Sequence, residues 1–291
     1  GEMEVGNLIA FTSYAMNILM GIMMLSMIVT MLPRVQVAIE RVYQIIDTPQ
    51  GINDPTTAIP TDKHSDTVTL EFDKVDFRYP GAEKLALENI NFSMKQGDKI
   101  AIIGGTGAGK STLSRLLLRL YDIESGSIRI DGVDIRQFKQ AELRQLLGFS
   151  PQEAVLFSGT IRENLQYGKA DATDDELWHA LKVAQGFDFV SNLPGGLDAR
   201  VEQGGSNFSG GQRQRLSIAR ALVTDAKILV FDDSFSALDF KTDAQLRKAL
   251  TPETRDKAVL IIAQRISTVV DADQILVLEH GQLVGSGTHE E

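Results

Sequence analysis

The most informative segment of the sequence reads Gly104-Gly105-Thr106-Gly107-Ala108-Gly109-Lys110-Ser111. It matches the pattern G-x-x-x-x-G-K-S/T, which is typical of loops that bind phosphate groups. The apolar, β-branched run at 99–103 predicts a buried strand before it, and the leucines at 112–120 have helical spacing after it. Strand, glycine-rich turn and helix are the context that the pattern requires. The sequence therefore predicts that this chain binds a nucleoside triphosphate.

Glycine suits such a loop because the backbone can then wrap closely around phosphates, with its N–H groups and a helix N-terminus facing the anion. Lys110 would reach the terminal phosphates, and Ser111 would ligate Mg²⁺. The flanking strand and helix disfavour the alternative, a glycine-rich turn without a ligand. The expected nucleotide-binding residues of this segment are Gly104, Gly105, Thr106, Gly107, Ala108, Gly109, Lys110, Ser111 and Thr112.

The composition excludes several classes of protein. The chain has 291 residues and a formal net charge of −10, whereas nucleic-acid binders usually present a basic face. It has no cysteine, which excludes disulfides and cysteine-based metal sites and fits a reducing compartment. The histidines lack the spacing of metal ligands, so we interpret all of them as surface or structural residues. They are His64, His179, His280 and His289.

Residues 8–32 contain no charged side chain and are mainly Leu, Ile, Met, Phe and Val. As a helix they would exceed the ~30 Å hydrocarbon core of a bilayer, so we expect one transmembrane helix. Arg34 and Arg41 follow the span and place its C-terminal side in the cytoplasm. A signal peptide is disfavoured because the basic residues lie on the wrong flank. A buried core helix is disfavoured by the length of the uncharged run.

The sequence predicts that the chain is divided into three parts. Residues 1–48 would form the membrane helix and a cytoplasmic extension that continues past Pro33, a residue that can kink a helix. Residues 49–67 are rich in Pro, Asn and Asp and would form a linker. Residues 68–291 would form the nucleotide-binding domain. Since one span cannot form a translocation path, we expect further spans upstream of this chain.

The domain would begin with antiparallel strands, because 68–72 alternates in polarity and 90–94 reads as the returning strand. Tyr79 lies between them and precedes a proline. Its ring could stack on the face of an adenine, since every base offers a π surface. A plain Tyr-Pro turn is the alternative, and the residues alone leave both interpretations open.

Two later segments add groups that bind phosphate or Mg²⁺. Ser209-Gly210-Gly211-Gln212 begins a predicted helix, whose N–H groups and dipole favour an anion. An apolar strand at 227–232 ends in Asp232, which would hold Mg²⁺ in the manner of the second half of a phosphate-loop site. A further buried strand at 258–263 leads to Gln264. Residues 161–192 read as helical.

Taken together, these motifs resemble the nucleotide-binding domain of an ATP-binding cassette (ABC) transporter. The resemblance rests on Tyr79, the loop 104–111, Gln152, Ser209 to Gln212, Asp232 and the Ser-Ala-Leu-Asp segment 236–239. Residues 156–164 resemble the exporter subclass, and residues 6–48 resemble the last membrane helix of an exporter half-transporter. The implied fold is α/β: a P-loop NTPase of the ABC type, with an antiparallel β lobe and a helical subdomain, preceded by a transmembrane helix.

The resemblance also implies a role for each matching residue. Tyr79 would stack on adenine, and Gln152 would sense both Mg²⁺ and the γ-phosphate. Ser209, Gly210, Gly211 and Gln212 would bind the γ-phosphate of a nucleotide held by the opposite subunit. Asp239 would communicate the state of the site to the opposite subunit across that dimer interface. The metal ligands would come from Ser111, Gln152 and Asp232, and the cofactors would be ATP and Mg²⁺.

Two positions depart from the pattern of the family, which usually has Glu where this chain has Asp233 and His where it has Gln264. Asp shortens the reach toward an attacking water by ~1.5 Å, and a ~1 Å misplacement can cost about a hundredfold in rate. Gln can hydrogen-bond but cannot carry a proton. We therefore expect Asp233, Gln264 and Gln152 to form a slow catalytic site that still binds ATP. The alternative is that Asp233 is a tolerated substitute in a working ATPase.

The leading function is one subunit of an ATP-driven exporter in a membrane, with its nucleotide-binding domain in the cytoplasm. The expected partners are a second, different half-transporter subunit, membrane lipid and a transported substrate that the sequence does not name, with no nucleic acid. One alternative is a regulatory or channel subunit that uses ATP as a ligand. Another is a soluble DNA-repair ATPase, which residues 8–32 and the net charge disfavour.

Overall fold

The computed structural model describes residues 5–48, 51–60 and 68–291. It divides into two compact units, residues 1–51 and residues 52–291. His64 and part of the predicted linker at 49–67 lie outside the described residues. Residues 52–60 belong to the second unit, in which Arg119 Nη2 donates to the carbonyl of Asn53 at 3.2 Å. The division of the chain at residue 68 stays a prediction.

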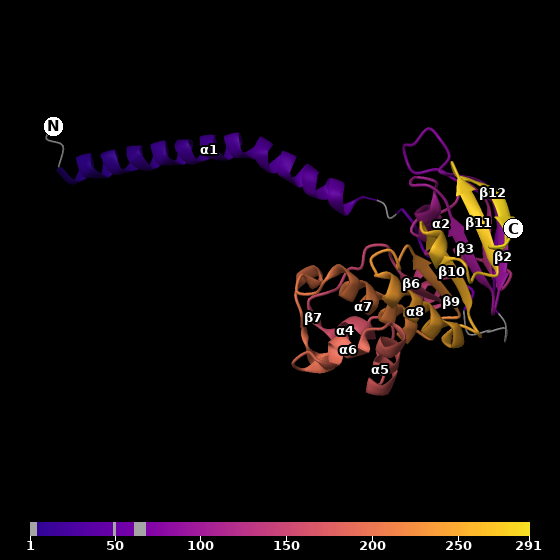
Figure 1. The fold of residues 1–291 in the computed structure, drawn as a ribbon. Helices are drawn as coiled ribbons and strands as arrows, with labels where there is room; N and C mark the ends of the chain where they lie inside the picture. The colour runs from indigo at the N-terminus through magenta and orange to yellow at the C-terminus, as the bar shows by residue number, and fades with distance from the viewer. Residues whose placement is uncertain (1–4, 49–50, 61–67) are drawn as a thin grey trace. The chain divides into compact units, whose positions relative to one another are not determined.

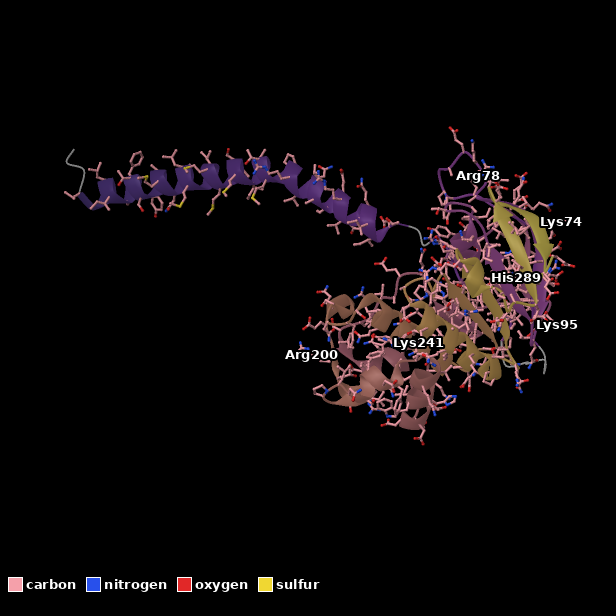
Figure 2. All side chains as sticks on the ribbon, in the orientation of Figure 1. Lys74, Arg78, Lys95, Arg200, Lys241 and His289 are labelled. Carbon is pink, nitrogen blue, oxygen red and sulfur yellow. The ribbon has the colours of Figure 1, made fainter. Side chains whose placement is uncertain are left out.

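The first unit is α1 (Val5–Ile46), a helix of 42 residues that includes Pro33. None of its described residues is buried. Figure 2 shows carbon and sulfur atoms along most of its length, with nitrogen atoms toward its C-terminal end. It is the one helix in the described part of the chain that is long and apolar enough to cross a bilayer. The predicted apolar helix and its continuation through Pro33 are confirmed.

The second unit is built on two main sheets (Figure 1). The antiparallel sheet has the order β2-β1-β4-β5, and the larger sheet has the order β12-β11-β3-β10-β9-β6. In the larger sheet all neighbours are parallel except β11 and β12. Strands β7 and β8 form a separate antiparallel pair. The strands are β1 (Thr69–Phe77), β2 (Leu87–Lys95), β3 (Lys99–Ile103), β4 (Ser125–Ile130), β5 (Val133–Asp134), β6 (Leu147–Ser150), β7 (Gly159–Thr160), β8 (Arg200–Val201), β9 (Ile228–Asp232), β10 (Ala258–Ala263), β11 (Gln274–Glu279) and β12 (Gln282–Gly287).

Helices complete the domain, and Figure 1 shows α4, α5 and α6 grouped apart from β2, β11 and β12. They are α2 (Lys110–Leu117), α3 (Gln140–Gln145), α4 (Ile161–Gln166), α5 (Asp174–Val183), α6 (Phe187–Ser191), α7 (Gly210–Val223) and α8 (Phe240–Glu253), with short 3-10 turns at Ile135–Gln137, Gly196–Asp198, Gln203–Gly205 and Ile266–Thr268. The region 161–192 is therefore three helices with turns between them, and the helical subdomain is confirmed.

The parallel sheet separates two hydrophobic cores. Along β10, Val259 and Ile261 belong to the core shared with the helical subdomain, whereas Leu260 and Ile262 belong to the core shared with the antiparallel sheet. Both faces of the strand are covered, which explains why the sequence of β10 is apolar throughout and does not alternate. Such a sheet fixes its strand ends firmly, so residues that follow those ends are well placed to form a site.

Candidate nucleotide-binding site

Four neighbouring strands of the parallel sheet, β3, β10, β9 and β6, each end beside a predicted site residue. Gly104 follows β3, Gln264 follows β10, Asp232 ends β9, and Gln152 lies two residues after β6. In a parallel sheet the carboxyl ends of neighbouring strands meet at one edge. The register keeps these ends level, since Ile262 pairs with Asp232. The fold therefore brings together residues that are far apart in the sequence.

The loop between β3 and α2 needs glycine at two positions for different reasons. A Cβ on Gly104 would lie 2.2 Å from the carbonyl oxygen of Leu278, so no side chain fits there. Gly109 has a φ of 105°, in the left-handed region that favours glycine, and no side chain caps the helix that follows it. The N-terminus of α2 therefore opens toward the space in front of the loop, as an anion site requires.

The ammonium of Lys110 lies over its own loop. Its Nζ donates to the carbonyls of Gly104 and Gly105 at 2.7 and 2.8 Å. Burial lowers the pKa of Lys110, while the nearby carboxylates of Asp233 and Asp232 oppose that shift. An ammonium has three donors, so Lys110 can keep loop contacts and still reach a phosphate oxygen.

Both carboxylate oxygens of Asp232 are held by hydroxyls from α2. Ser111 donates to Oδ1 at 3.1 Å, and Ser114 donates to Oδ2 at 2.7 Å. Asp232 and Ser114 are buried. The sequence predicted Ser111 and Asp232 as ligands of Mg²⁺ but did not predict a role for Ser114, which is one helical turn further along α2. Its position three residues after Ser111 is the signal that would have found it.

Asp233 lies next to Asp232 in an unusual backbone conformation, with a φ of 49°. Its carboxylate accepts a hydrogen bond of 3.4 Å from the amide of Gln152, and its own N–H donates to the carbonyl of Ile262 at 2.7 Å. Burial raises the pKa of the Asp233 carboxyl, although hydrogen bonds from the Gln264 backbone and the Ser236 side chain oppose the shift. The three residues with predicted catalytic roles, Asp233, Gln152 and Gln264, therefore meet.

Tyr79 stands at the other end of the site, and α2 fixes its hydroxyl. That hydroxyl lies 3.0 Å from Oγ1 of Thr112, and Arg115 Nη1 donates to it at 3.1 Å. The ring packs edge-on against Phe77 and Tyr121, with centroid distances of 4.9 and 5.2 Å. The half-buried residue lines the cavity described below, and the hydroxyl contacts fix the orientation of its ring.

These residues line one cavity of about 710 Å³. The volume lies within the range of ~300–1,000 Å³ that is usual for small-molecule sites. Lys84 and His280 also line the cavity; the side chain of His280 is exposed, as expected of a surface residue. The lining residues are Tyr79, Lys84, Leu85, Ala86, Thr106, Gly107, Gly109, Lys110, Ser111, Thr112, Gln152, Asp232, Asp233, Ile262, Gln264, His280 and Gly281.

The Ser209 motif and Asp239 are not among the described residues that line this cavity. Ser209 caps α7, where its hydroxyl accepts from the N–H of Gln212 at 3.3 Å and the Gln212 side chain accepts from the N–H of Ser209 at 2.9 Å. The serine hydroxyl keeps its own proton to donate. A Cβ on Gly210 would meet no atom within 4 Å, so space is open in front of the motif. Asp239 caps α8.

The fold and the site define an α/β phosphate-loop nucleotide-binding domain, and comparison with known proteins gives its family. The profile of the ABC transporter family matches residues 87–236. The chain therefore belongs to the ABC transporter family, as the motifs predicted. Its folded domain is an ABC-type ATPase domain.

Similar proteins extend the match over the whole chain. An uncharacterized ABC transporter ATP-binding protein of Mycobacterium tuberculosis is 44% identical over 294 residues, which cover 100% of this chain and 50% of the relative. A putative multidrug export ATP-binding/permease protein of Staphylococcus aureus is 41% identical over 86% of this chain and 43% of its own length. A bacterial Atm1-family ABC exporter with ATP bound has a TM-score of 0.89 at 36% identity, covering 100% of this chain and 51% of that one. The chain thus spans about half the length of these relatives.

Proposed function

We propose that this chain is the ATP-binding part of a membrane exporter subunit, which couples the binding and hydrolysis of ATP to export of a substrate. The observation that carries the proposal is the single cavity shared by Tyr79, Lys110, Asp232 and Asp233. It offers an aromatic face for the base, an ammonium for phosphates and carboxylates for a metal. The names of the similar Staphylococcus aureus protein and of the Atm1-family structure support export.

Three residues that line the cavity fit Mg²⁺. Ser111 Oγ and Asp232 Oδ1 lie 3.1 Å apart, and Gln152 lines the same space. Hydroxyl, carboxylate and amide oxygens are hard ligands of the type that Mg²⁺ prefers, alongside water and phosphate oxygens. Such an ion neutralises charge on the β- and γ-phosphates. Ser114 would keep the Asp232 carboxylate in the orientation that its ligand role requires.

We infer that this site binds ATP well and hydrolyses it slowly. In phosphoryl transfer the protein mainly positions the attacking water and stabilises charge. The Asp233 carboxylate is short for this task and is turned toward Gln152. Gln264 can accept or donate a hydrogen bond at the γ-phosphate but cannot take up a proton. Lys110, Ser111 and Asp232 keep the binding half of the site complete.

We further propose that the chain works with a different half-transporter subunit. Its Ser209 motif lies outside its own cavity and is complete, with an open space in front of Gly210. A homodimer would combine two slow sites, whereas a partner with Glu and His would supply a fast site. The Ser209 motif of this chain would complete that fast site by binding its γ-phosphate. Asp239 would lie at the interface between the subunits.

The exposed helix α1 supports a place in the membrane. None of its described residues is buried, and an unpaired apolar helix of this length is stable in lipid, where its backbone is satisfied internally. The basic residues Arg34 and Arg41 after the uncharged run support a cytoplasmic domain. The complete subunit would carry further spans that line the path of the substrate.

The proposal is tested by ATP turnover of the full-length subunit, purified with its co-expressed partner and reconstituted in lipid vesicles. A pump should show turnover that its transported substrate stimulates and that vanadate inhibits. If nucleotide binding occurs without any stimulated turnover, the chain serves as a regulatory or channel subunit, for which the pair Asp233 and Gln264 is the supporting observation. Absence of ATP binding would contradict both functions.

A further inference from the structure

A buried cluster of polar side chains lies directly beneath the candidate site. Its members come from β6, from α7 and from the turn that follows β9. Their exposed fractions are between 0% and 2%. We call it the polar cluster, and it consists of Ser150, Gln214, Ser217 and Ser234. Polar groups this deeply buried are normally kept only with hydrogen-bond partners, because an unpaired one costs the full desolvation penalty.

Ser234 connects the ends of two parallel strands. Its hydroxyl donates to the carbonyl of Ser150 at 2.8 Å, so the residue after Asp233 is tied to the last residue of β6. This bond joins the exits of β9 and β6 just beyond their last paired residues, Ser150 and Phe231. The backbone around Asp233 is thereby restrained at a point where its φ is positive.

Gln214 connects α7 to the segment that carries Gln152. Its Nε2 donates to the carbonyl of Pro151 at 3.1 Å and lies 3.5 Å from the hydroxyl of Ser150. The hydroxyl of Ser217, one turn further along α7, also lies 3.5 Å from that of Ser150. The two residues immediately before Gln152 are therefore both held by α7.

We propose that the polar cluster positions Gln152 against Asp233 and couples that pair to α7. The hydrogen bond between these two side chains is 3.4 Å long, and the cluster restrains the backbone on both sides of it. Buried polar networks with every member satisfied select one arrangement of the chain. Because Ser209 begins α7, a shift of Gln152 also shifts the helix that carries the Ser209 motif. This inference rests on the proposed function, and it makes Ser234 and Gln214 positioning residues.

The first test measures hydrogen exchange in the full-length protein without nucleotide. The variants are Ser234→Ala and Gln214→Met, which remove the hydrogen bonds and nearly keep the volume. The control is Thr254→Val, because Thr254 is also buried and its hydroxyl donates to the carbonyl of Leu250, in the last turn of α8, at 2.9 Å. We expect amide exchange of Asp233 and Ser236, whose N–H groups donate to the carbonyls of Ile262 and Asp233, to rise roughly threefold or more in both variants, the effect of losing one net hydrogen bond. The control should leave it unchanged.

The second test measures steady-state ATP turnover of the complete assembly. We expect kcat to fall about tenfold in Ser234→Ala and Gln214→Met, because a shift of α7 would misplace the Ser209 motif at the partner's fast site. KM for ATP should stay within about twofold, because among the described residues no hydrogen bond of the polar cluster goes to the phosphate loop or to Tyr79. The variant Ser234→Thr, which keeps the hydroxyl, should recover most of the activity.

Three results would overturn the inference: unchanged exchange at Asp233 and Ser236, an equal change in Thr254→Val, or a loss of kcat that Ser234→Thr does not recover. The two exchange outcomes are independent of the proposed function. Binding of ATP by the same variants, measured by equilibrium dialysis, reports on the phosphate loop. If that binding is absent in the wild-type protein, the proposed function fails, and the exchange data still decide whether the polar cluster restrains the backbone around Asp233.

Discussion

The two glycine-rich helix starts of this domain, at α2 and at α7, differ in what surrounds them. The start of α2 has no side-chain cap and faces a cavity that also contains two carboxylates and a tyrosine. The start of α7 is capped by its own Ser209 and Gln212, and it faces open space. The first is a nearly complete site within one chain. Among the described residues, the second offers phosphate-binding groups without a base pocket or a metal ligand, as expected of the part that we propose this chain contributes to a site on another subunit.

The largest expected effect tests the proposed role of the start of α7 in a site on the partner subunit. Ser209→Arg places a bulky cation where we propose that the partner's γ-phosphate lies, so turnover of the assembly should fall about 100-fold or more, as when a transition-state donor is lost. ATP turnover of the reconstituted assembly measures it. Ser191→Arg, at an exposed serine that ends α6, is the control and should leave turnover unchanged. Full activity in Ser209→Arg would contradict the role in trans.

The next largest effect tests the start of α2 as the nucleotide-binding site of this chain. Lys110→Ala removes the ammonium that we expect on the terminal phosphates, and hydrogen bonds to charged groups contribute ~1.5–3 kcal/mol each. Affinity for ATP at this site should fall about 100-fold, since each ~1.4 kcal/mol is tenfold. Equilibrium binding of a fluorescent ATP analogue measures it. Lys182→Ala, in the last turn of α5, should bind normally, and unchanged affinity in Lys110→Ala would show that the loop is not the binding element.

A smaller effect separates the two functions of Tyr79. Tyr79→Ala should lose ~1–3 kcal/mol of nucleotide binding if the ring stacks on the base. Tyr79→Phe keeps the ring but loses the contacts of the hydroxyl with Thr112 and Arg115, so it should lose only about threefold in affinity. Arg115→Ala should match Tyr79→Phe. Equal losses of affinity in Tyr79→Ala and Tyr79→Phe would assign the binding energy to the hydroxyl alone. If neither variant lost affinity, Tyr79 would be part of a turn without a role in nucleotide binding.

The smallest expected effect tests whether the catalytic part of this chain's own site is weak while its nucleotide-binding part is complete. The double change Asp233→Glu with Gln264→His restores the reach of the carboxylate and a proton carrier. Turnover of the assembly should rise, by at most about twofold, because only one further site becomes active. Steady-state ATPase assays measure it, with Asp233→Glu alone as the matched intermediate. A rise well above twofold would mean that this chain's site limits the whole assembly.

The sequence was sufficient to predict the residues at the strand ends. Each follows an apolar run, as Asp232 follows β9 and Gln264 follows β10, and parallel strands bring their carboxyl ends to one edge. It was also sufficient for α1, because a long uncharged run has few other interpretations. These features depend on patterns that are local in the sequence.

Other features depend on contacts between distant residues and were missed. Ser234 contacts Ser150, which lies 84 residues earlier, and no local pattern marks that pair. Helix α8 was not predicted, because only Asp243, Leu246 and Leu250 of it are buried and its apolar stripe is correspondingly thin. The single helical region predicted at 161–192 is interrupted by glycines such as Gly168, where a Cβ would lie 2.4 Å from the carbonyl of Arg220.

The central claim is that this chain holds ATP at its own phosphate loop while hydrolysis takes place elsewhere. The most direct measurement is the chemical identity of the nucleotide retained after the purified full-length assembly has turned over Mg²⁺-ATP and has been rapidly desalted. We expect one unhydrolysed ATP to be retained per assembly, and we expect Lys110→Ala in this chain to abolish the retention of that ATP. Recovery of this chain's nucleotide as ADP, together with sustained turnover by an assembly of this chain's subunit alone, would contradict it.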